Sequence, residues 1–268
     1  VLHAPARDLL DRFAPGAGDE VRAGLFLGQN LYTPRAIGIA AAQPFDRPWA
    51  AWLYLGAVAQ RAREGRLDTV EIDVGMVGPA ALGRQVQTAW HRLIGAPKPL
   101  GWANQLPDEP AFLASYLQKR RYGGGRLDLV AHAGITAGTV MTLGRLGGMV
   151  RFGQNLSGFG PDTVEPGGAM LQGHERGPGR AGSGEWYVFA GVDQRLVARN
   201  IFLDGTFFRD SPSVERRRHV YDLSAGFSLR LENVRLSFTR LRRSEEFRTP
   251  LGGGGVQRFD SLNIGIDF

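Results

Sequence analysis

The sequence predicts an all-β fold, an antiparallel transmembrane β-barrel with a short helix in one long loop. Segments of about ten residues alternate apolar and polar side chains, which is the period of a strand. About ten residues is also the length with which a tilted strand crosses a bilayer. The polar positions are rich in Gly, Ser, Asp and Arg, a set that suits a crowded or hydrated interior. The final alternating strand stops on an aromatic residue, Phe268, as outer-membrane barrels do.

The clearest alternation lies in HVYDLSAGFSLRL, residues 219–231. Leu223 and Phe227 share its apolar face, while Asp222 and Ser228 share the opposite one. A soluble sandwich or barrel turns such an apolar face inward, whereas a membrane barrel turns it outward to lipid. Strand length and the composition of the polar faces favour the membrane barrel, and a soluble lipocalin-like binder is the remote alternative.

About ten strands follow from this period. In chain order they are expected at 20–31, 50–60, 67–77, 110–121, 126–138, 143–154, 185–198, 218–231, 234–243 and 258–268. The connections alternate between short and long, as periplasmic turns and extracellular loops do. The short ones are 63–66, 123–125 and 232–233, and the long ones are 32–49, 78–109, 199–217 and 244–257. One long connection, 155–184, falls on the periplasmic side, and residues 4–13 are expected to form an amphipathic helix.

Composition narrows the class of protein. The 268 residues suit one strand-rich domain, and the complete lack of cysteine excludes disulfides and cysteine metal sites. The net charge is +6, carried almost wholly by dispersed arginines, since Lys98 and Lys119 are the two lysines. No nucleic-acid motif accompanies them, so nucleic acid is not an expected partner. No apolar run reaches the ~18 residues of a membrane helix.

One stretch departs from the strand period. In RQVQTAWHRLIGAPKPLGWANQL, residues 84–106, the spacing turns helical, and His91 lies among polar neighbours in an expected extracellular loop. The pKa range of imidazole suits a general base near neutral pH. Taken alone, such a histidine is more simply a surface residue. Trp90 and Trp102 flank the helix and either wall an acyl groove or anchor the loop at the membrane interface.

Several phrases together resemble the lipid A 3′-O-deacylase family, outer-membrane enzymes that remove acyl chains from lipopolysaccharide. The phrases occur in the family's order and span nearly the whole chain. They are GQNLYTP (28–34), DRPWAAWLYLG (46–56), LDTVEIDVGMVGPAALGRQVQTAWHRLIG (67–95), GWANQL (101–106), FAGVDQRLVARNIFLDG (189–205) and the closing strand. The resemblance implies a twelve-stranded barrel, about ten strands of which are represented here. It also implies a site between the barrel wall and an extracellular loop helix, with calcium as cofactor.

The family's water-activating histidine corresponds to His91, and a family glutamine one helical turn earlier corresponds to Gln87. The two are therefore expected to be catalytic. A glutamate that pairs with this histidine in some members is replaced by Pro97, and the family's Asn-Asp pair on its first strand has no match. We therefore expect residues 1–268 to be a single barrel domain that is N-terminally incomplete and lacks the first two strands.

The resemblance also suggests contacts at the outer rim. Tyr32, Thr33, Asp46, Arg47 and Arg92 are candidates for binding the phosphorylated head group, although a girdle aromatic and rim salt bridges would explain most of them. Calcium needs several oxygen ligands, and the chain shows no calcium-loop pattern, so no metal ligand is assigned.

The resemblance therefore implies a calcium-assisted lipid A deacylase in the outer membrane of a Gram-negative bacterium, with lipopolysaccharide as substrate. Further expectations are contact with outer-membrane lipid, a monomeric state and folding by the barrel-assembly machinery through the C-terminal strand. The alternative is a non-catalytic outer-membrane barrel, structural, lipid-binding or a small pore, without the ion site.

Overall fold

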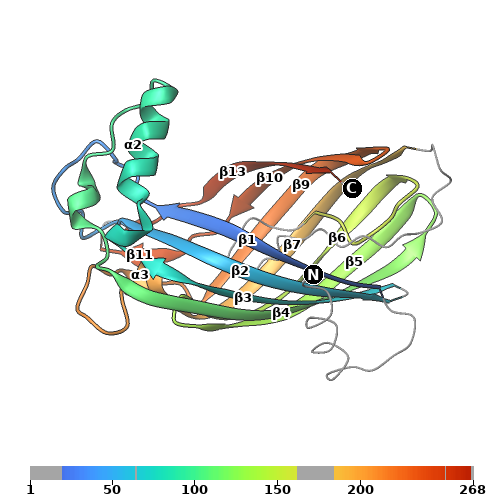
Figure 1. The fold of residues 1–268 in the computed structure, drawn as a ribbon, viewed down its shortest axis with the longest axis horizontal. Helices are drawn as coiled ribbons and strands as arrows, with labels where there is room; N and C mark the ends of the chain where they lie inside the picture. Colours follow the sequence, from blue (N-terminus) through green and yellow to red (C-terminus); the bar gives the residue numbers. More distant parts are fainter. Residues whose placement is uncertain (1–19, 64, 162–183, 251, 267–268) are drawn as a thin grey trace.

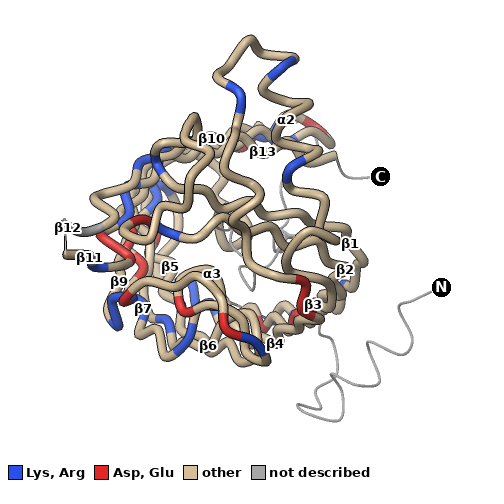
Figure 2. Tube along the Cα trace, turned by 90° about the vertical axis from the view of Figure 1, so that its left-hand side faces the viewer, with Lys and Arg blue, Asp and Glu red and all other residues tan. Residues whose placement is uncertain are grey.

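The sheet is antiparallel throughout and curls around a common axis (Figures 1 and 2). The structure, a computed structural model, describes residues 20–63, 65–161, 184–250 and 252–266. The ten strands pair in the order β1-β2-β3-β4-β5-β6-β7-β9-β10-β13. Their bounds are β1 (Glu20–Tyr32), β2 (Ala50–Arg63), β3 (Arg66–Val77), β4 (Glu109–Gly124), β5 (Leu127–Gly138), β6 (Met141–Gln154), β7 (Glu185–Asn200), β9 (His219–Leu231), β10 (Val234–Arg243) and β13 (Gln257–Ile266). The predicted fold class is confirmed.

Neighbouring strands in the sheet are neighbours in sequence, apart from the small elements described below. Short turns join strands at one end of the barrel, here called the turn end, and most long connections lie at the other, the loop end. The expected strands agree with the observed ones to within a few residues at each boundary. In the described part of the chain β1 pairs with β2 alone and β13 pairs with β10 alone. Because β1 and β13 do not pair with each other there, these ten strands form an open, curled sheet.

The outward face of the sheet is apolar and exposed. Leu27, Ile135 and Leu262 are 73%, 64% and 65% exposed, and similar side chains recur on every strand. The alternate positions turn inward and hold the buried charges. This arrangement is the reverse of a water-soluble domain and matches a barrel whose outer surface meets lipid.

The interior is divided into two zones. Near the loop end an apolar cluster joins strand residues such as Trp52 and Tyr54 to Ile201 and Phe202 of α3 (Ile201–Asp204), which crosses the barrel mouth (Figure 2). Phe202 stacks on Tyr32 of β1 with ring centroids 3.9 Å apart. The mouth is thus filled by inward-facing side chains from strands on opposite sides of the barrel, β1 and β2 on one side and the segment after β7 on the other.

Below this cluster the interior is charged. A series of ion pairs, here called the interior ladder, extends from Asp193 in the interior to Arg47 at the loop end. Arg195 Nη2 lies 2.6 Å from Asp222 Oδ1, and Arg243 Nη2 lies 2.8 Å from Asp222 Oδ2. Glu246 then bridges Arg243 at 3.4 Å and Arg47 at 2.6 Å. The interior ladder consists of Asp193, Arg195, Asp222, Arg243, Glu246 and Arg47.

The loops at the loop end contain small elements that the strand period did not predict. They are η1 (Pro79–Ala81), η2 (Gly101–Asn104), α3 and a three-stranded sheet of β8 (Glu215–Arg216), β11 (Phe247–Thr249) and β12 (Gly252–Gly253). The predicted loop helix is observed as α2 (Gly83–Leu93). The helix expected at 4–13 and the terminal Phe268 lie outside the described residues. No helix in the described part of the chain is long and apolar enough to cross a bilayer.

Asp222 is the central carboxylate of the interior ladder, since it meets both Arg195 and Arg243. Asp222→Asn should lower the free energy of unfolding by about 3–5 kcal/mol because two buried guanidinium groups lose their counter-charge. Urea unfolding in detergent micelles measures this. Asp260→Asn is the matched control: it breaks the exposed Arg240–Asp260 pair, which lies on the loop-end side of the apolar belt of β10 and β13, and should change stability little. Equal effects of the two variants would contradict a stabilising role of the ladder.

Candidate active site on the loop helix

Helix α2 is attached to the outer surface of the barrel wall. Gly83 begins the helix and leaves no space for a side chain, because a Cβ there would lie 2.4 Å from Ala51 Cβ and 2.6 Å from the Trp102 ring. One turn of η1 precedes it, and Gln29 of β1 donates to the Ala81 carbonyl at 2.6 Å. The start of α2 is therefore fixed against β1 and β2. From there the helix extends away from the wall, transverse to the long axis of the barrel (Figure 1).

A pair of tryptophans holds the far side of the loop. Trp49 and Trp102 are both 2% exposed, and their rings lie 5.1 Å apart at 58°. Trp102 Nε1 donates to Gln87 Oε1 at 2.7 Å. Because only Oε1 of a glutamine amide can accept, this contact fixes the amide orientation and leaves Nε2 as a donor. Gln87 thus links α2 to η2 of the same loop, and its predicted catalytic role stays a prediction.

His91 lies one turn beyond Gln87, near the end of α2, and is partly exposed. Its Nδ1 lies 2.6 Å from the Pro97 carbonyl oxygen. A carbonyl oxygen can only accept, so Nδ1 must carry the proton, and in the neutral ring Nε2 keeps its lone pair. In some family members a glutamate orients this histidine. Here Pro97 occupies that position, and its backbone carbonyl orients the His91 ring instead.

The other predicted site residues do not join His91. Tyr32 and Arg47 point to the inner side of the wall, where Arg47 lies 5.6 Å above the Tyr32 ring and pairs with Glu246. Asp46 accepts from the backbone N–H groups of Arg35 and Arg47 at 2.9 and 2.7 Å. These contacts support the structural interpretation of the rim.

Arg92 and Thr33 have different surroundings. Arg92 is exposed on α2 and lines an open hollow with Arg84, Gln85, Thr88 and Ala89. Thr33 is half-buried directly after β1. Of the five substrate-binding candidates, Arg92 lies on the same helix as His91, and the other four do not. Strands β1 and β2 form the wall that separates α2 from the inward-facing Tyr32 and Arg47.

The described residues contain no cluster of carboxylates for a calcium ion. No group of three or more His, Cys, Asp or Glu side chains in them could hold a metal ion. The first acidic residues that follow α2 in the chain are engaged by backbone N–H groups. Asp108 accepts from Ala80 at 2.7 Å, and Glu109 accepts from Phe207 and Phe208 at 2.8 and 3.0 Å. We therefore derive no chemical step through calcium from these residues.

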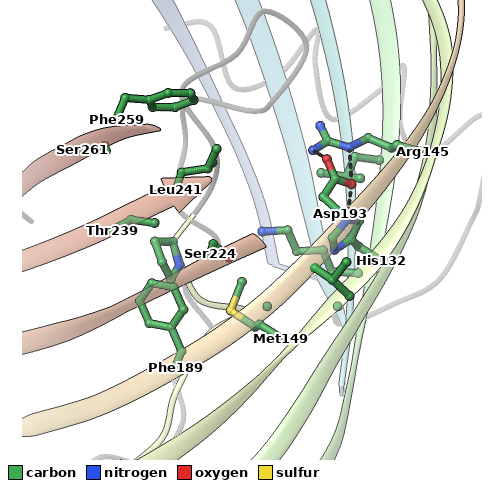
Figure 3. A pocket seen from close by; sticks show the side chains of 16 residues that line it. His132, Arg145, Met149, Phe189, Asp193, Ser224, Thr239, Leu241, Phe259 and Ser261 are labelled. Atoms are coloured by element: carbon green, nitrogen blue, oxygen red, sulfur yellow. Dashed lines mark hydrogen bonds and ion pairs between the residues drawn. The ribbon is translucent and has the colours of Figure 1, made fainter. Parts of the chain in front are cut away.

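A second polar group lies inside the barrel, beside a pocket (Figure 3). Asp193 is bound by His132 at 2.9 Å and by Arg145 at 2.7 Å, and Ser224 lines the same pocket. This set looks like a nucleophile with a base, yet the cavity measures about 50 Å³. Such a space holds about one or two water molecules and no acyl chain. The group is best explained as interior charge pairing.

Sequence reasoning missed the contacts that fix this region. The Trp49–Trp102 pair and the ion pair of Arg47 with Glu246 join segments far apart in the chain. The one available signal was the presence of two tryptophans in short loop motifs. Nothing in the spacing of the ladder residues shows which arginine meets which carboxylate.

Gly83→Val should displace α2 from the wall, because its side chain would occupy the space of Ala51 Cβ and the Trp102 ring. We expect trypsin to cleave after Arg92 faster in this variant while the barrel stays folded, as judged by its heat-dependent gel shift. Gly38→Val is the matched control, since no atom lies within 4 Å of a Cβ at Gly38. Unchanged cleavage in Gly83→Val would show that this contact does not hold the helix.

Comparison with known proteins agrees with this fold. Among solved structures, LpxR from Salmonella typhimurium superposes with a TM-score of 0.78 at 20% sequence identity, covering 99% of this chain and 96% of that chain. The search of curated proteins found no match. The sequence model of the family described as outer membrane protein LpxR matches residues 3–268. The chain therefore belongs to the family of the outer membrane protein LpxR.

Proposed function

We propose that this protein is a lipid A deacylase-like hydrolase, which removes a 3′-linked acyl or acyloxyacyl group from lipopolysaccharide in the outer membrane of a Gram-negative bacterium. Family membership supports a deacylase-like hydrolase. The observation that carries the proposal is the contact of His91 Nδ1 with the Pro97 carbonyl. It leaves Nε2 as a base on a helix at the barrel's outer rim.

The proposed reaction is hydrolysis of an ester by water. His91 Nε2 takes a proton from the water as the water oxygen bonds to the ester carbonyl carbon. The bond from that carbon to the sugar oxygen then breaks, and the imidazolium returns the proton to this oxygen. The products are a free fatty acid and a sugar hydroxyl, so the step consumes one water and no other reactant.

An ester hydrolase also needs donors where negative charge develops on the carbonyl oxygen. Gln87 offers Nε2 as a donor on the same face of α2, since its Oε1 is held by Trp102. Gln87 is therefore proposed to stabilise this oxygen or to position the ester.

Calcium stays part of the proposal through the family resemblance alone. The described residues provide no carboxylate cluster for it. A calcium titration of the activity, with a chelator as the reverse test, decides this part separately. Activity that is unaffected by chelation would remove calcium from the proposal and leave the histidine in place.

The charge of the α2 loop suits an anionic substrate. Residues 78–106 contain no Asp or Glu, while Arg84, Arg92 and Lys98 are exposed. Arginine and lysine side chains are the usual partners of phosphate groups. Arg92 is proposed to contact a phosphate of the lipid A head group because it lies next to His91 in sequence.

A non-catalytic barrel is the second candidate, and one observation favours it: the described residues place no carboxylate against His91. A small pore, one form of the non-catalytic barrel, has less support because side chains fill the barrel mouth. Phe202 stacks on Tyr32 across the barrel mouth, and both belong to the apolar cluster that fills it. A monomeric state and assembly through the C-terminal strand remain predictions.

His91→Ala should lower the rate of 3′-deacylation by about 10²–10⁴-fold through loss of the general base. Mass spectrometry of lipid A from a lipopolysaccharide-producing host measures the product. His219→Ala is the matched control: His219 is exposed at the start of β9, where it bonds to Gln194, and its loss should leave the product unchanged. Unaltered lipid A with the parent protein folded in the outer membrane would exclude the hydrolase.

A further inference from the structure

Helix α2 carries an apolar stripe that the protein does not cover. Trp90 and Leu93 are 57% and 76% exposed, and Leu82 and Val86 continue the stripe at helical spacing. Ile94 extends it past the end of the helix. The stripe lies beside the wall-facing side of the helix, which holds Gly83 and Gln87. A row of large apolar side chains along a whole helix marks a surface that contacts something apolar.

The stripe adjoins the lipid-facing belt of the barrel. Gln29 on the outward face of β1 donates to Ala81, which directly precedes the helix. Leu27 and Leu25 follow on that same face, 73% and 57% exposed. Two strand residues span about 7 Å, so the belt begins within one side-chain length of the helix base. The exposed apolar surface therefore continues from the wall onto α2.

The opposite side of α2 is polar and cationic. Arg84, Gln85, Thr88 and Arg92 line the open hollow on this side. Lys98 in the following loop is also exposed, and residues 78–106 contain no acidic residue. An amphipathic helix with a basic polar face and Trp and Leu on the other is the kind that lies in a membrane interface.

The orientation of α2 agrees with this. The helix lies across the long axis of the barrel at its loop end (Figure 1). Because the barrel axis runs through the membrane, a helix across it lies in the plane of the membrane surface.

We propose that α2 lies in the outer-leaflet interface, with its apolar stripe among lipid acyl chains and its cations at anionic head groups. The proposal commits to lipid rather than a protein partner, since the stripe continues the lipid belt and its flanking charges are all positive. Trp90 would hold its neighbour His91 at the boundary between acyl chains and head groups. This contact requires no hydrolysis, so it stands or falls separately from the proposed enzyme activity.

The absence of cysteine from the sequence makes the test direct. Leu93→Cys, Gln85→Cys and Leu27→Cys are each spin-labelled and reconstituted in vesicles of phosphatidylcholine with phosphatidylglycerol. Collisions with oxygen report lipid exposure, and collisions with a water-soluble nickel complex report water exposure. We expect the Leu93→Cys label to match the lipid-exposed Leu27→Cys label, with oxygen collisions dominant. The Gln85→Cys label should show the reverse.

Two results would overturn the proposal. A Leu93→Cys label as open to nickel as the Gln85→Cys label would place the stripe in water. A label shielded from both reagents would mean that protein covers it. The Leu27→Cys label confirms in each sample that the barrel has inserted. In vesicles of phosphatidylcholine alone the Leu93→Cys label should lie less deeply, and an equal depth would overturn the anionic head-group part.

Discussion

Hydrocarbon offers no hydrogen-bond partners, so every backbone N–H and C=O group of a membrane-spanning wall must be satisfied within the protein. The continuous antiparallel pairing from β1 to β13 meets this demand between neighbouring strands of the described sheet, apart from the outer edges of β1 and β13. Once the backbone is paired in this way, side chains alternate between lipid and interior. The outward positions become apolar, and buried charges such as Asp222 are paired with opposite charges inside the barrel.

The interior ladder is a set of such paired charges. Asp222 accepts from Arg243 with both oxygens and meets Arg195 with Oδ1, and Glu246 links Arg243 to Arg47. The last pair joins the loop after β1 to the loop after β10, so charge pairing also closes the loop end. The family resemblance suggests Arg47 as a substrate contact, and this stays a prediction. In the structure Arg47 pairs with Glu246 and so joins two loops.

Helix α2 is outside this network. It is attached by the close contact at Gly83, the Gln29–Ala81 bond and the Trp102–Gln87 bond, all on the outer face of the wall. The helix is therefore placed by a few packed contacts at its base, while its far end and His91 lie towards the surroundings. The exposed apolar stripe and His91 are two features of this one exposed helix.

The sequence by itself determined the strands, the turns and the loop helix, because alternation and helical spacing are local periods that any pairing must respect. It also indicated the family, which the family model confirms, and predicted a catalytic role for His91, which stays a prediction. Only the tertiary structure decided which side of the wall each residue occupies, and it separated Tyr32 and Arg47 from α2. The partner of His91 could not be predicted either: Pro97 has no acid, but chain folding brings its carbonyl to Nδ1. Such contacts depend on how distant segments meet in space, which no local period records.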